Sequence, residues 1–310
     1  MDKKKISVII PSYNEENNIM PMYKRLIAVF RKSSYEYEII FVNNGSTDRS
    51  DSIFENLAKK DIRVKVIFLS RNFYKSQGAY TAGIDLASGH ATVLIDGDLQ
   101  DPPEKIPDLI KQWEKGYDIV YGVRVKRNES LVRRISYKLF YRLFKKLSYV
   151  NIPLDAGDFS LLDKKVVAVF QQLQERNRYI RGLRAWVGFR SIGVPYERKE
   201  RYRGFSTNSF LDNVKWAIFA VFSFSYMPLE LISLLAILTI TVTIIAIVGY
   251  TISYFLNPHV PKGFQTLLLT SFFLGAVQLI CFTIIAQYLK IIFEEIKQRP
   301  KYIIEKILNK

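Results

Sequence analysis

The stretch VLIDGDLQDPPE, residues 93–104, joins a run of apolar and β-branched residues to a cluster of acids. Asp96 and Asp98 bracket Gly97, a third acid follows at Asp101, and two prolines then prevent the chain from continuing as a strand. The pattern predicts a buried strand that ends in carboxylates. Carboxylates so close together repel one another, so we expect positive charge to lie between them.

Similar apolar runs recur through residues 1–210, and helix-like stretches separate them. Residues 16–31, for example, carry apolar side chains at the spacing of an amphipathic helix. This alternation predicts an α/β domain with a parallel sheet and helices on both faces. The expected strands are Ile6–Ile10, Glu38–Val42, Val64–Leu69, Thr92–Ile95 and Asp118–Tyr121.

The unusual polar residues come directly after these strands, in the segments PSYNEE, NNGSTD, SRN, DGDLQD and GVR. In open α/β sheets, ligands bind at the carboxyl ends of the strands. Ordinary turn and helix-cap chemistry is the alternative, and it explains NNGSTD by itself. It does not explain three acids within residues 96–101, so we expect a ligand site at this edge.

Asp96 and Asp98 point to the same side of an extended chain, so both carboxylates can reach one cation. Gly97 between them lets a ligand approach the backbone closely. A pair of acids with other coordination positions open suits Mg²⁺ or Mn²⁺ that bridges to a substrate diphosphate. The two histidines, His90 and His259, have no cysteine nearby, so no zinc site is expected.

The composition changes along the 310-residue chain. Residues 231–256 and 265–289 carry no charge, and each is long enough to cross a hydrocarbon core of roughly 30 Å as a helix. A pair of buried core helices is the alternative. The loop 257–264 holds one Lys, whereas residues 290–310 hold six Lys or Arg. This bias predicts a cytoplasmic tail and, with two spans, a cytoplasmic N-terminal domain.

The net charge of +16 suits a polyanion or an anionic membrane. Residues 128–149 combine Leu and Ile at four-residue spacing with a row of Lys and Arg, which is typical of a helix on a membrane surface. A helix packed on the sheet is the alternative. Residues 210–226 are expected to form a second interfacial helix. Because the basic residues gather in these segments and in the tail, anionic membrane lipid explains the charge better than nucleic acid, and no nucleic-acid partner is expected.

Seven segments, in this order, resemble the family 2 glycosyltransferases of GT-A fold: PSYNEE, VNNGSTD, LSRNF, IDGDLQDPPE, GYDIVYGVR, AGDFSLLDKKVV and RGLRAWVGF. More narrowly, they are similar to the polyprenyl-phosphate glycosyltransferases, which include dolichyl-phosphate mannose synthases and bactoprenol glucosyltransferases. The resemblance implies that a sugar is transferred, with inversion, from a nucleotide sugar to polyprenyl (undecaprenyl) phosphate. A UDP-linked hexose or N-acetylhexosamine is the expected donor, with Mg²⁺ or Mn²⁺ as the cofactor.

The resulting domain prediction is a cytoplasmic GT-A (Rossmann-like) catalytic domain at residues 1–209 and an interfacial amphipathic helix at 210–226. A transmembrane hairpin at 227–289 and a basic cytoplasmic tail at 290–310 follow. The protein is therefore expected in the cell (inner) membrane, with both termini in the cytoplasm. Gly249 and Gly275 in the two spans would let another copy pack closely, so a homo-oligomer stays open.

The resemblance also implies roles for individual residues. Asp96, Asp98 and Gln100 fall at the metal and the diphosphate, and Asp158 in AGDFSLL matches the family's proposed catalytic acid. A phosphate acceptor is largely ionised near neutral pH, so Asp158 is expected to orient the acceptor or to complete a proton transfer, with a turn or cap role as the alternative. The nucleotide sugar is expected at Pro11, Tyr13, Asn14, Glu15, Asn44 and Asp96.

The acceptor or another phosphate is expected at Arg124, Arg133, Arg134, Ser136, Arg203 and Ser206. The sequence departs from the family pattern at two places. Asn44 stands where an Asp usually precedes Gly-Ser, so contacts to the base are expected to differ. The stretch RYRGFSTNSF lacks the Lys that usually follows Ser or Thr, which leaves the donor sugar open among glucose, N-acetylglucosamine, galactose and mannose.

Two other functions stay open. A processive polysaccharide synthase shares the fold but usually carries Q-x-x-R-W and more spans, whereas this chain has RGLRAW and two spans. A non-catalytic membrane protein that binds nucleotide sugars is the other alternative. The D-x-D sequence together with Asp158 argues against it, because binding alone does not need all three acids.

Overall fold

The computed structural model describes residues 3–125, 148–153, 155–198, 210–256 and 263–310. The chain forms two units, which are described separately. Unit 1 comprises Met1–Lys145, Val150–Asn213 and Gln298–Lys310, and unit 2 comprises Lys146–Tyr149 and Val214–Lys297. The basic helix predicted at 128–149 lies almost entirely outside the described residues.

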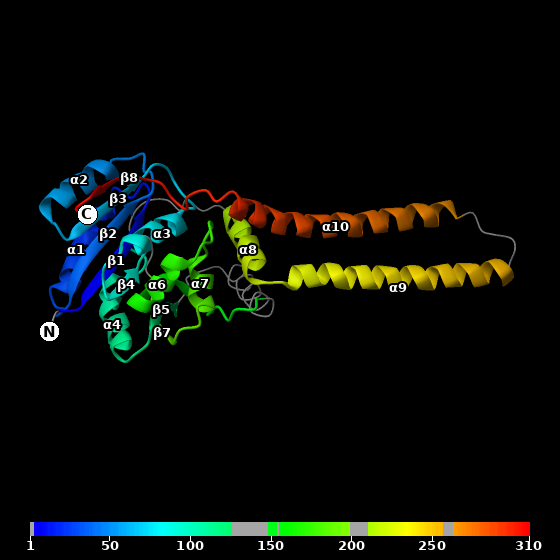
Figure 1. Ribbon diagram of the computed structural model, residues 1–310, viewed down its shortest axis with the longest axis horizontal. Helices are drawn as coiled ribbons and strands as arrows, with labels where there is room; N and C mark the ends of the chain where they lie inside the picture. Colours follow the sequence, from blue (N-terminus) through cyan, green and yellow to red (C-terminus); the bar gives the residue numbers. More distant parts are fainter. Residues whose placement is uncertain (1–2, 126–147, 154, 199–209, 257–262) are drawn as a thin grey trace. The chain divides into compact units, whose positions relative to one another are not determined.

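Unit 1 is built around an eight-stranded sheet with the order β7-β5-β6-β4-β1-β2-β3-β8 (Figure 1). Its strands are β1 (Lys5–Ser12), β2 (Glu36–Asn43), β3 (Val64–Leu69), β4 (Ala91–Leu94), β5 (Ile119–Arg124), β6 (Ala156–Asp163), β7 (Ser191–Tyr196) and β8 (Ile304–Leu308). The five predicted strands are confirmed as β1 to β5. The sheet is mixed rather than wholly parallel, because β6 runs antiparallel to β4 and β5, and β8 runs antiparallel to β3.

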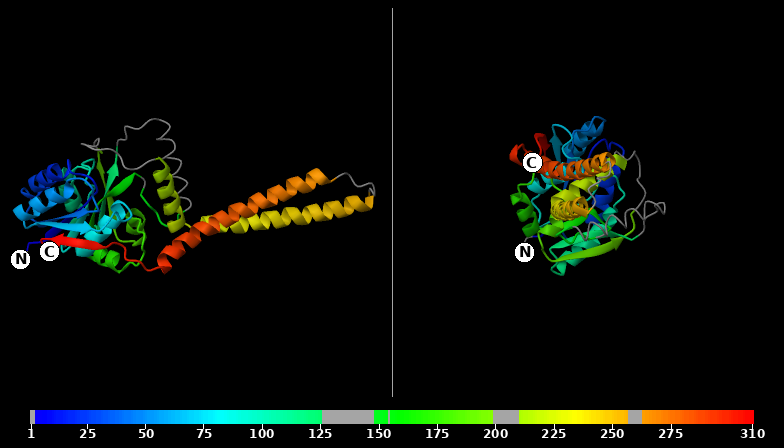
Figure 2. Two further views of the ribbon diagram at one scale, coloured as in Figure 1. Left: turned by 90° about the horizontal axis from the view of Figure 1, so that it is seen from above. Right: turned by 90° about the vertical axis from the view of Figure 1, so that its right-hand side faces the viewer.

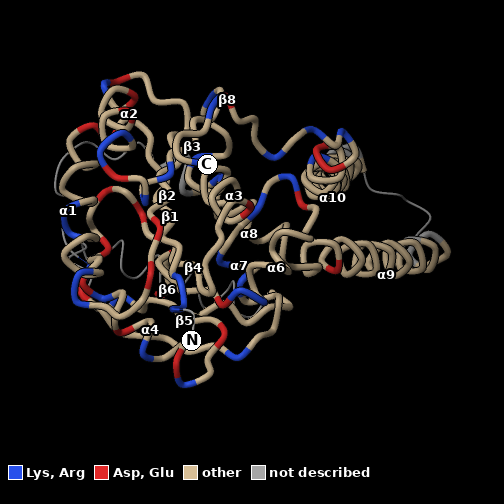
Figure 3. The backbone as a smooth tube through the Cα atoms, turned by 60° about the vertical axis from the view of Figure 1, so that its left-hand side comes forward, with Lys and Arg blue, Asp and Glu red and all other residues tan. Residues whose placement is uncertain are grey.

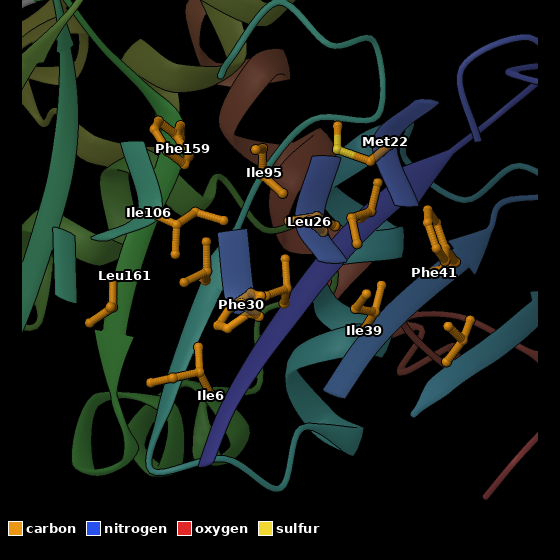
Figure 4. Close-up of a cluster of buried hydrophobic side chains, with 14 of the residues drawn as sticks. Ile6, Met22, Leu26, Phe30, Ile39, Phe41, Ile95, Ile106, Phe159 and Leu161 are labelled. Atoms are coloured by element: carbon orange, nitrogen blue, oxygen red, sulfur yellow. The ribbon is translucent and has the colours of Figure 1, made fainter. Parts of the chain in front are cut away.

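Helices cover both faces of this sheet, as the sequence predicted. They are α1 (Ile19–Phe30), α2 (Ser50–Lys60), α3 (Ser76–Leu86), the 3-10 helix η1 (Pro103–Lys105), α4 (Ile106–Glu114), α6 (Lys164–Gln172) and α7 (Ile180–Trp186). Successive side chains of a strand point to opposite faces. Ile6, Val8 and Ile10 of β1 pack into a core with residues of α1, α2 and α4 (Figure 4). Ile9 faces α3, where a Cβ on Gly83 would come within 2.3 Å of the Ile9 side chain.

The end of the chain returns to unit 1 and completes its sheet. β8 pairs with β3 so that Ile307 lies opposite Ile67, and Leu308 packs against the core. Nδ2 of Asn309 donates hydrogen bonds to the carbonyls of Ala58 and Val64 over 2.7 and 2.9 Å. The segment predicted as a basic tail at 290–310 therefore holds the end of a long helix and an edge strand. Without a neighbour, the outer edge of β3 would expose unpaired backbone N–H and C=O groups. The backbone of β8 pairs with these groups, and the apolar side chains of β8 bury surface.

Unit 2 consists mainly of α9 (Met227–Leu256), α10 (Phe264–Ile296) and the part of α8 (Phe210–Phe224) that follows Asn213. Two of them are long and apolar enough to cross a membrane within the described residues, over Met227–Gly249 and Leu269–Ile296, with mean hydropathies of 2.8 and 2.1. α9 and α10 run side by side in both views of Figure 2 and carry few charged residues along their length (Figure 3). Their side chains are largely exposed, so the alternative of buried core helices is wrong.

Candidate active site

The loops that follow β1, β2 and β3 interlock at the carboxyl edge of the sheet. Asn14, in the left-handed region at φ 55°, accepts a 2.7 Å hydrogen bond from the Thr47 backbone, and its own N–H donates to Oγ of Ser46 over 3.0 Å. Gly45, at φ 72°, lies so close to the next loop that a Cβ would come within 2.6 Å of the Arg71 backbone. Only glycine fits this approach at a positive φ.

Asn44 holds the loop that follows β3. Its Nδ2 donates to the carbonyl of Lys75 over 2.7 Å, and its Oδ1 accepts from the backbone N–H of Phe73 over 2.9 Å. The side chain is only 2% exposed. The predicted contact of Asn44 with the nucleotide stays a prediction, and the position of its amide indicates that it acts by shaping the loop 72–75.

Three acids gather where β4 ends. Tyr80 of α3 donates a 2.8 Å hydrogen bond to Asp96, and the Tyr196 hydroxyl donates to Oδ1 of Asp101 over 2.5 Å. Arg198 lies nearby, with Nη2 at 4.0 Å from Asp98 and Nε at 3.6 Å from Asp101. The positive charge that the sequence predicted among these acids is thus supplied in part by an arginine from the segment after β7.

The charge balance around Asp96 remains unfavourable for a carboxylate. Burial raises its pKa first, and Asp98, Asp101 and Asp158 raise it further, to about 7, whereas the Tyr80 hydrogen bond lowers it. Asp98 accepts a hydrogen bond from the backbone N–H of Gln100 over 3.1 Å. Repulsion of this kind is relieved by a cation that carries more than one positive charge.

The donor set fits a divalent cation that a substrate shares. Among the described residues, no three His, Cys, Asp or Glu side chains are grouped closely enough to hold a metal by themselves. Mg²⁺ and similar ions are commonly held by one or two carboxylates, with substrate phosphates and water as the other ligands. Asp96 and Asp98, with Gln100 beside them, match that incomplete arrangement. Oδ2 of the fully buried Asp101 also has no hydrogen-bond partner among the described residues.

Asp158 lies within β6, which excludes a turn or cap role for it. Its Oδ1 and Oδ2 accept from Nε and Nη2 of Arg181, on α7, over 3.0 and 3.1 Å. Nε2 of Gln77 lies 3.4 Å from Oδ2. Burial would raise the pKa of Asp158, but Arg181, Arg184 and Arg124 together lower it below its usual value.

Two more guanidinium groups surround the same stretch of β6. Nη1 of Arg184 donates to the Gly157 carbonyl over 3.1 Å, while its Nη2 has no partner among the described residues. Arg124 packs over Gly157, where a Cβ would lie 2.6 Å from its Nη2. Nε of Arg124 also donates to the Tyr196 hydroxyl over 3.2 Å, which links this arginine to Asp101.

The structure brings most of the described candidates to one edge of the sheet. Pro11 is the second-last residue of β1, and its carbonyl oxygen would lie 2.7 Å from a Cβ on Gly97. Tyr13, Asn14 and Glu15 follow β1 in the next loop. Five phosphate-binding candidates lie outside the described residues: Arg133, Arg134, Ser136, Arg203 and Ser206.

Sequence reasoning missed several residues that hold the site together. They are Gln77, Tyr80, Asp101 as an acceptor for Tyr196, Arg181, Arg184, Tyr196 and Arg198. One signal was available in the sequence, the pair of arginines in RGLRAW, which served for the family resemblance and for the comparison with Q-x-x-R-W but was given no role in the site.

Comparison with known proteins identifies the family. Residues 7–170 match the family Glycosyl transferase family 2. An uncharacterised glycosyltransferase of Synechocystis sp. is 39% identical over 302 residues, covering 96% of this chain and 94% of that protein. The SfII prophage-derived bactoprenol glucosyl transferase of Shigella flexneri is 36% identical over 303 residues, covering 97% and 98%. The crystal structure of mannosyl-3-phosphoglycerate synthase from Rubrobacter xylanophilus gives a TM-score of 0.49 at 15% identity, covering 71% of this chain and 73% of that one.

The match to the family covers more than half of the chain. Relatives that share more than a third of its residues extend over nearly its whole length. This protein therefore belongs to glycosyltransferase family 2.

Proposed function

We propose that this chain is a membrane-anchored hexosyltransferase that moves a sugar from a nucleotide sugar to polyprenyl phosphate, with inversion at the anomeric carbon. The observation that carries the proposal is that two kinds of phosphate-binding group lie at the same edge of the sheet, a pair of carboxylates and a cluster of arginines. Asp96 and Asp98 suit a metal-bound diphosphate, and Arg124, Arg181 and Arg184 surround the neighbouring Asp158. The similarity to a protein named bactoprenol glucosyl transferase over almost the full chain supports polyprenyl phosphate as the acceptor.

The residues divide between donor and acceptor. Pro11, Tyr13, Asn14, Glu15 and the loop that Asn44 shapes would hold the nucleotide. Mg²⁺ or Mn²⁺ at Asp96 and Asp98, beside Gln100, would stabilise the charge on the leaving diphosphate. Arg124 would bind phosphate at the acceptor side, together with Arg133, Arg134, Ser136, Arg203 and Ser206.

The same proposal places unit 1 and both termini in the cytoplasm, beneath the cell (inner) membrane. β1 and β8 belong to one sheet, so the chain must cross the membrane an even number of times between them. Two apolar helices, α9 and α10, satisfy this condition. The six Lys and Arg of residues 290–310 indicate the cytoplasmic side. The basic segments would contact anionic lipid there.

A donor panel tests the reaction. Membranes that contain the protein would receive undecaprenyl phosphate, Mg²⁺ or Mn²⁺, and one labelled UDP- or GDP-sugar at a time. We expect one donor to transfer label to the organic phase, and Asp96→Asn to abolish the transfer. Asp108→Asn is the matched control, because Asp108 is an exposed acid on α4. Donor binding without transfer from any sugar would support the non-catalytic alternative, and a ladder of polymeric products would support a processive synthase.

Labelling of a single introduced cysteine tests the topology. Lys262→Cys, in a chain that also carries Cys281→Ser, places a thiol in the predicted outer loop. An impermeant thiol reagent added to intact cells should modify Cys at 262, whereas a thiol introduced at Lys310 should react only after the membrane is opened. Modification of position 262 only from the cytoplasmic side would overturn the proposed orientation.

A further inference from the structure

Both oxygens of Asp158 are already engaged in the structure. Arg181 binds them in a two-point contact at 3.0 and 3.1 Å, and the Asp158 side chain is 5% exposed, whereas that of Arg181 is 25% exposed. A carboxylate held in this way by a guanidinium is a weak proton acceptor, because protonation would break two charge-assisted hydrogen bonds. The guanidinium of Arg181, by contrast, has five N–H donors, of which this contact uses two, and its side chain is partly accessible.

Asp158 lies within a cluster of arginines. Three guanidinium groups, those of Arg124, Arg181 and Arg184, lie close enough to Asp158 to favour its ionised form. Arg184 is 3% exposed, and its Nη2 has no hydrogen-bond partner among the described residues. Arg184 and Arg181 both face Asp158, so a further anion beside these two cations would be stabilised.

The acceptor of the proposed reaction is such an anion. A phosphate monoester has a second pKa of about 6 and is largely a dianion at neutral pH. Neighbouring guanidinium groups favour the dianion further. A dianionic phosphate oxygen carries a free electron pair and needs no base to release it.

We propose that Asp158 is a positioning residue that anchors Arg181, and that Arg181 and Arg124 receive the acceptor phosphate in front of the buried charge of Arg184. This inference rests on the proposed function and assigns a role to Arg181 within it. The phosphate oxygen forms a bond to the anomeric carbon with its own electron pair, and the bond from that carbon to the nucleotide diphosphate breaks. The bonding pair leaves with the diphosphate, and no proton is transferred. Charge balances, because a dianionic acceptor becomes a monoanionic diester as the leaving group gains one negative charge.

The test compares Arg181→Gln, Asp158→Asn and the double variant with the full-length wild-type protein in lipid nanodiscs. Steady-state rates give kcat and the acceptor KM for undecaprenyl phosphate at saturating donor, and calorimetry gives the affinity for UDP with Mn²⁺. We expect Arg181→Gln to raise the acceptor KM by about 10- to 100-fold, as for the loss of a hydrogen bond between charged groups, with UDP affinity unchanged. Asp158→Asn should raise the acceptor KM to a similar extent, and the double variant should be no worse than either single variant.

Two further variants serve as controls. Arg181→Lys retains the charge without the two-point contact and should give an intermediate acceptor KM. Arg31→Gln removes an exposed arginine at the end of α1 and should change nothing. Retained UDP binding shows that a variant is folded, and if Asp158→Asn does not fold, Arg181→Lys carries the comparison.

Three outcomes would overturn the inference. A large fall of kcat in Asp158→Asn at an unchanged acceptor KM, with Arg181→Gln near wild type, would make Asp158 a base. A loss of UDP affinity in Arg181→Gln at an unchanged acceptor KM would assign the arginine to the donor diphosphate. An unchanged acceptor KM in both single variants would show that Arg181 and its contact with Asp158 have no role in acceptor binding. The proposed function fails separately, if the wild-type protein forms no glycolipid at all.

Discussion

The hydroxyl of Tyr80 donates a 2.8 Å hydrogen bond to Oδ1 of Asp96, which places a fully buried phenol behind the first acid of the D-G-D sequence. Burial and three neighbouring acids raise the pKa of Asp96 to about 7, and the Tyr80 hydrogen bond opposes that shift. A cation binds the ionised carboxylate, so Tyr80 favours the form of Asp96 that cofactor binding needs.

We predict that Tyr80→Phe weakens cofactor binding. Loss of one hydrogen bond to a charged group should lower the affinity for Mn²⁺ in the presence of UDP by about tenfold. Because the pKa of Asp96 is raised, the affinity of the wild-type protein should increase from pH 6 to pH 8, and Tyr80→Phe should move this increase to higher pH. Calorimetric titrations at pH 6, 7 and 8 measure both effects.

Tyr23→Phe is the matched control for this change. Its hydroxyl donates a 2.9 Å hydrogen bond to Asp61, away from the D-G-D sequence, so its loss should leave Mn²⁺ affinity and its pH dependence as in the wild type. An equal effect of the two substitutions would show that Tyr80 contributes only to general stability.

A second prediction concerns Asn44. Asn44→Asp restores the residue usual in the family but removes the amide donor that binds the Lys75 carbonyl. A carboxylate at this 2% exposed position would face acceptors it cannot satisfy, so we expect a loss of about 1–3 kcal/mol in stability and a higher KM for the donor. Thermal unfolding and donor kinetics measure the two effects. Asn56→Asp, on an exposed part of α2, is the control, and a lower donor KM in Asn44→Asp would show that the position contacts the nucleotide directly.

Local patterns in the sequence predicted the first five strands and the acids at 96–101, because strand ends and turn residues are encoded by neighbours in the chain. β6 was not predicted, because AGDFSLLD contains Gly, Ser and two Asp, and its place between β4 and β5 depends on pairing with distant strands. β8 was not predicted either, because IEKIL follows a long apolar helix in a basic segment and becomes a strand only by pairing with β3.

The same difference between local and long-range information applies within the site. Asp96 and Asp98 were predicted as a pair from a two-residue spacing, which the backbone alone determines. The partner of Asp158 was not predicted, because Arg181 reaches it only when α7 packs beside β6. The contact of Tyr80 with Asp96 was not predicted either, because it depends on how α3 packs on the face of the sheet opposite α1 and α4.

A third prediction concerns the return of the chain to unit 1. Asn309→Ala removes the donor that binds the carbonyls of Ala58 and Val64, and we expect it to destabilise the pairing of β8 with β3 by about 1–3 kcal/mol. Hydrogen exchange should then quicken at Val66, Ile67 and Phe68, three of the β3 residues that pair with β8. Lys310→Ala, at an exposed position, is the control. Unchanged exchange in Asn309→Ala would mean that strand pairing alone holds the end of the chain.

The last prediction concerns Glu38, a buried carboxylate near the amino-terminal end of β2. Burial by itself would raise its pKa, but hydrogen bonds from Ser7, Ser88 and Lys5 and the charge of Lys65 outweigh burial and lower the pKa to about 2. A carboxylate whose pKa is lower in the folded than in the unfolded protein stabilises the fold above the unfolded value of about 4.3. That contribution is lost as the pH falls from about 4.3 toward 2.

Glu38→Gln should therefore lower the free energy of unfolding by about 2–3 kcal/mol at pH 7, and by progressively less as the pH falls below about 4. Chemical unfolding of the detergent-solubilised protein at pH 7, 5, 4 and 3 measures the difference. Glu36→Gln, at an exposed position of the same strand, should show little effect at any of these values. A difference between Glu38→Gln and wild type that stays constant down to pH 3 would mean that shape and hydrogen bonding, rather than the charge of Glu38, stabilise this end of β2.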